Sequence, residues 1–314
     1  MNYLKDYREG EKFVGTYLCK QKQILKTKAG KTYYSLTLQD KTGTADGKIW
    51  ELNNGIANFE PMDYIHCEGM VTSFQGNLQM NISRVRISDE GEYDPVDYVP
   101  CTNKDVGEMF SRILKYVASV QNKYLRKILE MYFVENKEFV DAFKKHSAAK
   151  SVHHGFMGGL LEHTLSVTDM CQYFAEHYPM IHRDLLITAA LFHDMGKIQE
   201  ISDFPMNDYT DDGQLLGHIY IGARCMENAA AQIPNFPPKL KNELVHCILA
   251  HHGKMEFGSP KVPAIMEAMA LHMADNADAK LQTLTEVFTQ AGDNMGWLGF
   301  NRMFESNLRK TSEE

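Results

Sequence analysis

Apolar and polar side chains alternate along residues 13–88 with the two-residue period of β-strands, and Gly, Asn and Asp interrupt the alternation. The strands that this pattern predicts are residues 13–27, 32–39, 44–50, 64–74 and 78–87. Residues 54–63, between the third and fourth strands, are predicted as a helix or a loop. Five short strands with a connection at this place predict a five-stranded Greek-key β-barrel.

The predicted strands also carry a family resemblance. The runs YYSLTLQDKTGTADGKIW (33–50) and YIHCEGMVTSFQGNLQMNISRVRI (64–87) resemble the nucleic-acid-binding OB folds related to anticodon-binding domains. The resemblance implies that residues 1–91 form an OB-fold domain that binds single-stranded nucleic acid.

After residue 104 the hydrophobic period becomes helical and stays so to the end of the chain. Val106, Met109, Phe110, Ile113, Leu114 and Val117 recur at three- and four-residue spacing. Residues 92–104 hold prolines and little periodicity, so they are predicted as a linker. The predicted fold class is therefore a multidomain α and β protein, with a five-stranded barrel (1–91), the linker (92–104) and an all-α domain (105–314).

Composition excludes several classes of protein. The chain has 314 residues, a formal net charge of −8 and six cysteines without a CxxC pair. Reduced thiols are therefore expected, and neither a disulfide framework nor a zinc ribbon is. The first residues, MNYLKDYREG, are charged and unlike a signal peptide, and the longest apolar stretch, Leu185 to Phe192, is too short to span a membrane. These features predict a cytoplasmic protein without a membrane partner.

Charge is unevenly distributed, and the barrel region is basic. Residues 12–50 contain eight lysines against Asp40 and Asp46. Aromatic residues that stack on bases, among lysines that follow phosphates, are typical of single-strand binding surfaces. The candidates are Tyr33, Tyr34, Trp50, Phe74, Lys26, Lys28 and Lys48. The alternative is that the aromatics fill the barrel core and the lysines form a solvated face. Strand alternation requires that one of Tyr33 and Tyr34 points inward.

The helical half holds a set of histidines and aspartates. His193 and Asp194 follow an apolar helix, and a buried carboxylate there needs a partner. Further imidazoles and a carboxylate make a cation the simplest partner. The clusters are His163, His193-Asp194, His218, His251-His252 and Asp275. Nitrogen and oxygen ligands without thiolates favour Mn²⁺, Co²⁺, Fe²⁺ or Mg²⁺.

These clusters resemble the HD phosphohydrolase superfamily in the extended pattern GGLLEHTL…ALFHDMGK…GH…LAHHG…HMADNADAK, which covers about residues 150–280. The resemblance implies two divalent metal ions. His163, His193, Asp194 and Asp275 would hold one ion, and Asp194 would bridge to a second held by His218 and His251. Asp194 would act in catalysis, and Lys197 would contact the scissile phosphate.

Some neighbouring residues stay ambiguous at this stage. His252 is a second choice for the ligand role of His251. Asp278, one helical turn from Asp275, is an alternative to it as a ligand, but it is expected instead to orient a ligand. His153 and His154 could contact a substrate phosphate or cap a helix. Residues 297–310 could pack on the helical core, which we favour, or form a subunit contact in a homo-oligomer.

An OB fold joined to an HD domain in a chain of this length resembles the bacterial YhaM-type 3′→5′ exoribonucleases. The resemblance implies Mn²⁺- or Co²⁺-supported release of nucleoside 5′-monophosphates from single-stranded RNA, with single-stranded DNA also accepted; Mg²⁺ and Fe²⁺ are alternative metals. Two other functions stay open. One is a non-catalytic single-strand-binding replication or regulatory factor, and the other is an HD phosphohydrolase that acts on small nucleotides.

Overall fold

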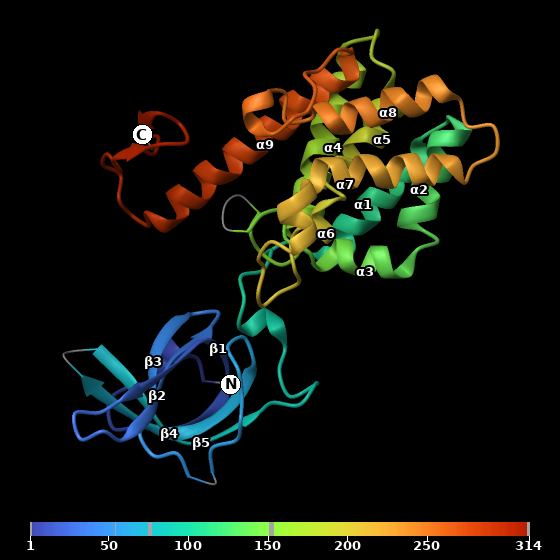
Figure 1. Cartoon of the computed structure of the whole chain (residues 1–314). Helices are drawn as coiled ribbons and strands as arrows, with labels where there is room; N and C mark the ends of the chain where they lie inside the picture. The colour runs from blue at the N-terminus through green and yellow to red at the C-terminus, as the bar shows by residue number, and fades with distance from the viewer. Residues whose placement is uncertain (1, 54, 75–76, 151–153, 313–314) are drawn as a thin grey trace. The chain divides into compact units, whose positions relative to one another are not determined.

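The computed structural model describes residues 2–53, 55–74, 77–150 and 154–312. The chain divides into two compact units (Figure 1). The first comprises Met1–Cys101 with Phe204–Met206, and the second comprises Thr102–Asp203 with Asn207–Glu314. The division after Cys101 falls inside the predicted linker.

The first unit is a closed five-stranded barrel, as the strand-period pattern predicts. Its strands are β1 (Lys12–Lys26), β2 (Thr32–Asp40), β3 (Gly43–Ile49), β4 (Tyr64–Phe74) and β5 (Asn77–Ile87). The order around the barrel is β1-β2-β3-β5-β4, with β3 and β5 parallel and the other pairs antiparallel. The sequence predicts a helix or a loop between β3 and β4, and the structure shows the loop. Its described residues, 55–63, contain turns but no helix.

Inward-facing residues of the strands form the barrel core. Phe13, Leu36, Leu38 and Ile65 are fully buried, and Phe59 of the β3–β4 loop joins them. The chain beyond β5 then packs on the outside of the barrel. Tyr93 stacks on Tyr64 with ring centroids 4.0 Å apart, and a 3₁₀ turn (Pro95–Asp97) follows it.

The second unit is helical throughout its core, as predicted. Its helices are α1 (Val106–Ser119), α2 (Lys123–Phe133), α3 (Lys137–Lys145), α4 (Gly159–His177), α5 (Arg183–Phe192), α6 (Lys197–Glu200), α7 (Asp211–Ala231), α8 (Pro238–Ala250) and α9 (Met266–Gln290). Every residue of α5 from Leu185 to Phe192 is buried, which explains its uninterrupted apolar sequence. Among the described residues, no helix is both long enough and apolar enough to span a bilayer.

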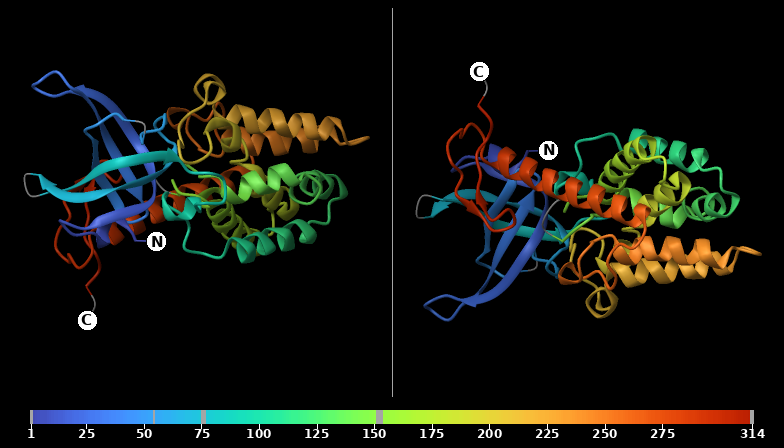
Figure 2. Two further views of the ribbon diagram at one scale, coloured as in Figure 1. Left: turned by 90° about the horizontal axis from the view of Figure 1, so that it is seen from below. Right: turned by 90° about the horizontal axis from the view of Figure 1, so that it is seen from above.

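The C-terminal part of α9 extends beyond the other helices of its unit (Figures 1 and 2). A short hairpin, β6 (Phe300–Asn301) with β7 (Ser306–Asn307), follows it. The prediction of helices to the end of the chain is therefore wrong for the described residues after Gln290, which form turns and this hairpin. The side chains of Trp297 and Phe300 are 69% and 65% exposed. The favoured expectation that this segment packs on the helical core therefore does not hold for these two aromatics.

A candidate metal centre and an aromatic face

The predicted metal ligands come from five separate places in the helical unit. They lie on α4 (His163), directly after α5 (His193 and Asp194), in α7 (His218), directly after α8 (His251 and His252) and on α9 (Asp275). Although more than 100 residues separate the first from the last, the fold brings all of them together around the carboxylate of Asp194.

One group faces the Oδ2 atom of Asp194. The Nε2 atoms of His163 and His193 are 3.1 Å apart, and they lie 3.3 and 3.5 Å from this oxygen. Oδ1 of Asp275 is 3.2 Å from Nε2 of His163 and 3.9 Å from that of His193. Ligands bound at about 2.1 Å to one metal ion are roughly 3.0–3.4 Å apart. Three of these five distances fall in that range, and the two from His193 to the carboxylates, 3.5 and 3.9 Å, exceed it slightly. The four atoms are thus close to the spacing of ligands around one cation.

The second group faces the other oxygen, Oδ1 of Asp194. Nε2 of His218 lies 3.5 Å from it, and Nε2 of His251 lies 3.6 Å from it. All three atoms are buried without a hydrogen-bond partner among the described residues. Buried polar atoms are normally satisfied, so three such atoms that face one another fit a cation between them. The two groups could thus hold two divalent ions with Asp194 in common.

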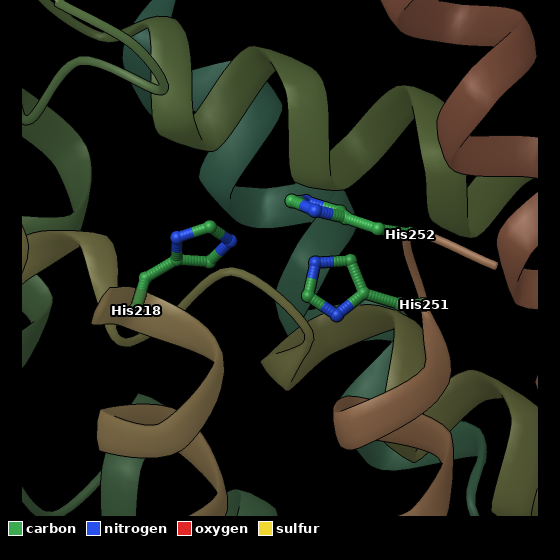
Figure 3. A group of neighbouring side chains, drawn as sticks. All are labelled: His218, His251 and His252. Carbon is green, nitrogen blue, oxygen red and sulfur yellow. The ribbon is translucent and has the colours of Figure 1, made fainter. Parts of the chain in front are cut away.

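His252 belongs to this second group as well. Its ring converges with those of His218 and His251 (Figure 3), and one ligand atom from each of the three lies within 4.8 Å of the others. The sequence offers His251 and His252 as alternative ligands, whereas the structure brings both rings to the second group, next to His218.

Every imidazole of the centre is held through its Nδ1 atom. His193, His251 and His252 donate to the backbone carbonyls of Ala190, Ile248 and Phe257, at 2.8, 2.6 and 2.7 Å. His163 and His218 instead contact the carboxylates of Asp278 and Glu200, at 2.7 and 2.9 Å. Because a backbone carbonyl can only accept, the proton of His193, His251 and His252 is on Nδ1, and Nε2 of these three rings presents its lone pair to the centre.

The protonation states of the metal-free protein agree with this arrangement. Burial lowers the pKa of His193 to about 4 and, together with His251 and His218, that of His252 to about 3. For His163, burial is outweighed by Asp194, Asp275 and Asp278, which raise its pKa well above the ordinary value. Without a metal ion, His163 therefore carries the additional proton of the first group. His193 and His252 are neutral, which is the form of imidazole that binds a cation.

Lys197 lies within the same cluster. Its Nζ is 2.8 Å from Oδ2 of Asp194, and the side chain is nearly buried. Burial disfavours the ammonium form, but the adjacent carboxylate outweighs it and raises the pKa of Lys197. Lys197 in turn helps to hold the pKa of Asp194 well below its usual range, against the effect of burial.

Of the two further histidines in the sequence prediction, only His154 can be placed, since His153 lies outside the described residues. His154 is buried, and its ring centroid is 5.3 Å from that of His163. Its Nδ1 is 3.7 Å from Oδ2 of Asp278. The structure thus places His154 against the side of the first group where Asp278 holds His163.

Sequence reasoning missed Glu200. This carboxylate is buried at the end of α6, and burial is outweighed by its hydrogen bonds from His218, which lower its pKa. Glu200 lies on the same helix as Lys197, shortly after the HD motif. Its contact with His218, however, depends on how α6 packs on α7. No spacing rule in the sequence would have found it.

On the barrel, Tyr33 and Trp50 form the aromatic feature of the predicted binding surface. Residue 34 pairs with residue 49 across β2 and β3, which places Tyr33 beside Trp50. The two rings stack with centroids 4.6 Å apart, and Trp50 is 40% exposed. Nε1 of Trp50 donates to Oδ1 of Asn81 at 3.1 Å, which fixes the plane of the indole.

The other predicted barrel residues have different surroundings. Tyr34 is the inward member of the tyrosine pair and packs edge-on against Phe59. Nζ of Lys48, with its side chain only 15% exposed, lies 2.6 Å from Oδ1 of Asp46. The remaining candidates are exposed: Lys26, Lys28 and Phe74. The candidates with side chains that are at least partly exposed are thus Tyr33, Trp50, Phe74, Lys26 and Lys28.

Comparison with known proteins gives a match to one domain family and to several relatives over most of the chain. The HD domain family model matches residues 160–280, a range that contains all the predicted metal ligands. The chain is 33% identical over 257 residues to the "3′-5′ exoribonuclease YhaM" of Geobacillus sp. (strain WCH70), with 81% of this chain and 78% of that protein covered. This chain belongs to the YhaM family.

Further members of the YhaM family have the same degree of similarity. The proteins of that name from Bacillus subtilis (strain 168) and Listeria innocua serovar 6a are each 32% identical, over 81% and 90% of both chains, respectively. Among solved structures, the second OB-fold domain of replication protein A from Methanococcus maripaludis covers 29% of this chain and 98% of its own, with 20% identity and a TM-score of 0.24. The fold of the barrel in this YhaM-family chain is assigned from its strand order, β1-β2-β3-β5-β4, and from its closure.

Proposed function

We propose that this chain is a metal-dependent 3′-5′ exoribonuclease. It hydrolyses phosphodiester bonds of single-stranded RNA to nucleoside 5′-monophosphates and also accepts single-stranded DNA. The observation that carries the proposal is that the two oxygens of Asp194 face two separate sets of imidazole Nε2 atoms, in a chain whose relatives are named 3′-5′ exoribonucleases.

In this proposal His163, His193, Asp275 and Oδ2 of Asp194 hold one divalent ion. Oδ1 of Asp194, His218 and His251 hold the other, with His252 as an additional ligand of the same group. Imidazole and carboxylate donors without a thiolate suit Mn²⁺ or Co²⁺, and Mg²⁺ and Fe²⁺ are the alternatives. When bound there, such ions would supply the Lewis acidity that lowers the pKa of a water molecule and offsets the charge of a phosphodiester.

The chain's own residues prepare the site for this chemistry. Asp278, Glu200 and three backbone carbonyls fix the imidazole rings, so that little reorganisation is needed when a substrate binds. Lys197 keeps a positive charge within 2.8 Å of Asp194. Such a fixed charge stabilises the negative charge that develops on a phosphoryl group during hydrolysis.

The barrel supplies affinity for the strand. The stacked pair Tyr33 and Trp50 offers an ordered aromatic surface to a base, and exposed Lys26 and Lys28 attract phosphates. Stacking does not require a particular base, so this surface would bind RNA with little sequence preference.

Replacement of Trp50 by Ala should weaken binding of a single-stranded oligoribonucleotide by about 5- to 150-fold, because stacking contributes roughly 1–3 kcal/mol per base. Fluorescence anisotropy at fixed salt would measure the dissociation constant. Trp297→Ala is the matched control, since it removes an exposed tryptophan of the other unit. Equal affinities of wild type and Trp50→Ala would exclude this aromatic from the binding surface.

The function itself is tested with a single-stranded oligoribonucleotide labelled at its 5′ end. We expect a ladder that shortens from the 3′ end with Mn²⁺ and no products with EDTA. Hydrolysis of free nucleotides without hydrolysis of the oligonucleotide would instead indicate a small-molecule phosphohydrolase. Binding without hydrolysis under any of the four metals would indicate a non-catalytic single-strand-binding factor.

Mn²⁺ should also stabilise the fold, because the ligands are buried and preformed only in the native state. At a free concentration 100 times the dissociation constant, one site adds about 2.7 kcal/mol to the free energy of unfolding. The unfolding midpoint of the helical unit should then rise by roughly 5–10 °C, as measured by calorimetry in EDTA and in Mn²⁺. The same midpoint in both solutions would contradict a metal site built from these residues.

A further inference from the structure

The carboxylate of Glu200 makes an unusual double contact with one residue of the centre. Its Oε1 atom accepts the backbone N–H of His218 at 2.9 Å and also meets Nδ1 of the same ring at 2.9 Å. Glu200 is only 8% exposed. Since Oε1 already accepts the backbone N–H, it meets the ring nitrogen as an acceptor, and Nδ1 of His218 carries the proton.

The backbone around this contact is built to allow it. Gly217 interrupts α7 with φ 72° and ψ 152°, a conformation that side chains with a Cβ rarely adopt. This kink turns the N–H and the ring of His218 toward the same carboxylate oxygen. Glu200 is anchored in turn, because its carbonyl accepts the backbone N–H of Thr210 at 2.9 Å. The consecutive helices α6 and α7 are thus fixed against each other at this point.

Each of the two ligand groups contains one imidazole with a carboxylate behind it. In the first group Asp278 meets Nδ1 of His163 at 2.7 Å, and in the second Glu200 meets Nδ1 of His218. A carboxylate partner fixes the tautomer of an imidazole and makes its other nitrogen a stronger ligand than a carbonyl partner does. Nε2 of His218 points at Oδ1 of Asp194 from 3.5 Å and has no hydrogen-bond partner among the described residues.

We propose that Glu200 is a positioning residue that orients His218 as a ligand of the second metal ion. It holds the proton on Nδ1 and leaves the Nε2 lone pair directed at Asp194. This inference rests on the proposed function, since it concerns the second ion of the same site. It predicts that loss of Glu200 lowers the affinity for one of the two ions and leaves the affinity for the other unchanged.

The test compares Mn²⁺ binding by the full chain in three variants, using isothermal titration calorimetry with bound ions counted by electron paramagnetic resonance. For Glu200→Ala we expect one ion with the wild-type affinity and one bound about 10- to 100-fold more weakly. Glu200→Gln keeps an acceptor oxygen and should lie between. Glu267→Ala is the matched control, because Glu267 is also 8% exposed and accepts a backbone N–H, that of His182, away from the centre.

A second measurement needs no metal. The ring-nitrogen NMR signals of His218 in the metal-free protein should show protonated Nδ1 in the wild type and a mixture of tautomers in Glu200→Ala. Unchanged tautomers, two ions with wild-type affinity in Glu200→Ala, or an equal loss of both ions would each overturn the proposal. So would the same loss in Glu267→Ala. If the wild type neither binds Mn²⁺ nor cleaves RNA, the proposed function fails, and the tautomer of His218 still decides the role of Glu200.

Discussion

Asp194→Asn should reduce hydrolysis of single-stranded RNA by about 1,000-fold or more, because removal of one member of a catalytic unit abolishes most of its effect. The two oxygens of Asp194 face different ligand groups, His163 with His193 on one side and His218 with His251 on the other. The carboxamide has almost the same shape, but it loses the negative charge and presents an N–H₂ group to one of the two sets. A single substitution therefore disturbs both candidate ion positions.

The affinity of Asp194→Asn for RNA should stay within about twofold of the wild type, since the predicted binding surface lies on the barrel. Single-turnover cleavage and fluorescence anisotropy on the same oligonucleotide would measure the two quantities. Asp169→Asn is the matched control, because Asp169 also lies on the helical unit but pairs with Arg112 instead of the centre. If Asp194→Asn keeps more than a tenth of the wild-type rate, Asp194 does not bridge two ions.

Gly196→Ala should have the second large effect, on both stability and activity. A Cβ at residue 196 would lie 2.1 Å from the backbone carbonyl oxygen of His218 and 2.9 Å from the backbone nitrogen of Gly222. Backbone atoms cannot move aside as a flexible side chain can, so the start of α6 would have to separate from α7. Overpacking of this kind costs about 1–3 kcal/mol, and here it also displaces His218 from Asp194.

Chemical denaturation should therefore show a loss of about 1–3 kcal/mol for Gly196→Ala, and cleavage should fall by at least about 100-fold. Gly222→Ala is the matched control, because it lies in the same contact of α6 with α7. Its Cβ would be 3.5 Å from the side chain of Ile248, an ordinary contact distance. Wild-type stability in Gly196→Ala, or an equal loss in Gly222→Ala, would show that the close approach at Gly196 does not matter.

The architecture was accessible from the sequence because it depends on local periodicity. Alternation with a period of two predicts the five strands, and the change to a helical period after residue 104 predicts the helices of the second unit. For the connection between β3 and β4 the sequence leaves helix and loop open, since a ten-residue segment with Gly55 and Pro61 among its few apolar residues carries no clear periodic signal. Family membership was likewise accessible, because it rests on runs of residues that can be compared directly.

The candidate ligands were accessible for a related reason. Each lies in a short motif, such as the adjacent His193 and Asp194 or the adjacent His251 and His252, whose composition already suggests chemistry. The motifs do not say how the ligands share the centre. The structure brings His251 and His252 to the same group, because the chain turns directly after α8 and the carbonyl of Phe257 holds the second ring.

Only the tertiary structure decided which side chains from different segments of the chain contact one another. Alternation required one of Tyr33 and Tyr34 to face inward, but only the closed barrel, with Phe59 inside it and Trp50 outside, shows that it is Tyr34. Glu200 reaches His218 because α6 packs against the kink of α7. The energy of such contacts depends on distance and direction in space, and neither quantity is encoded in local spacing along the sequence.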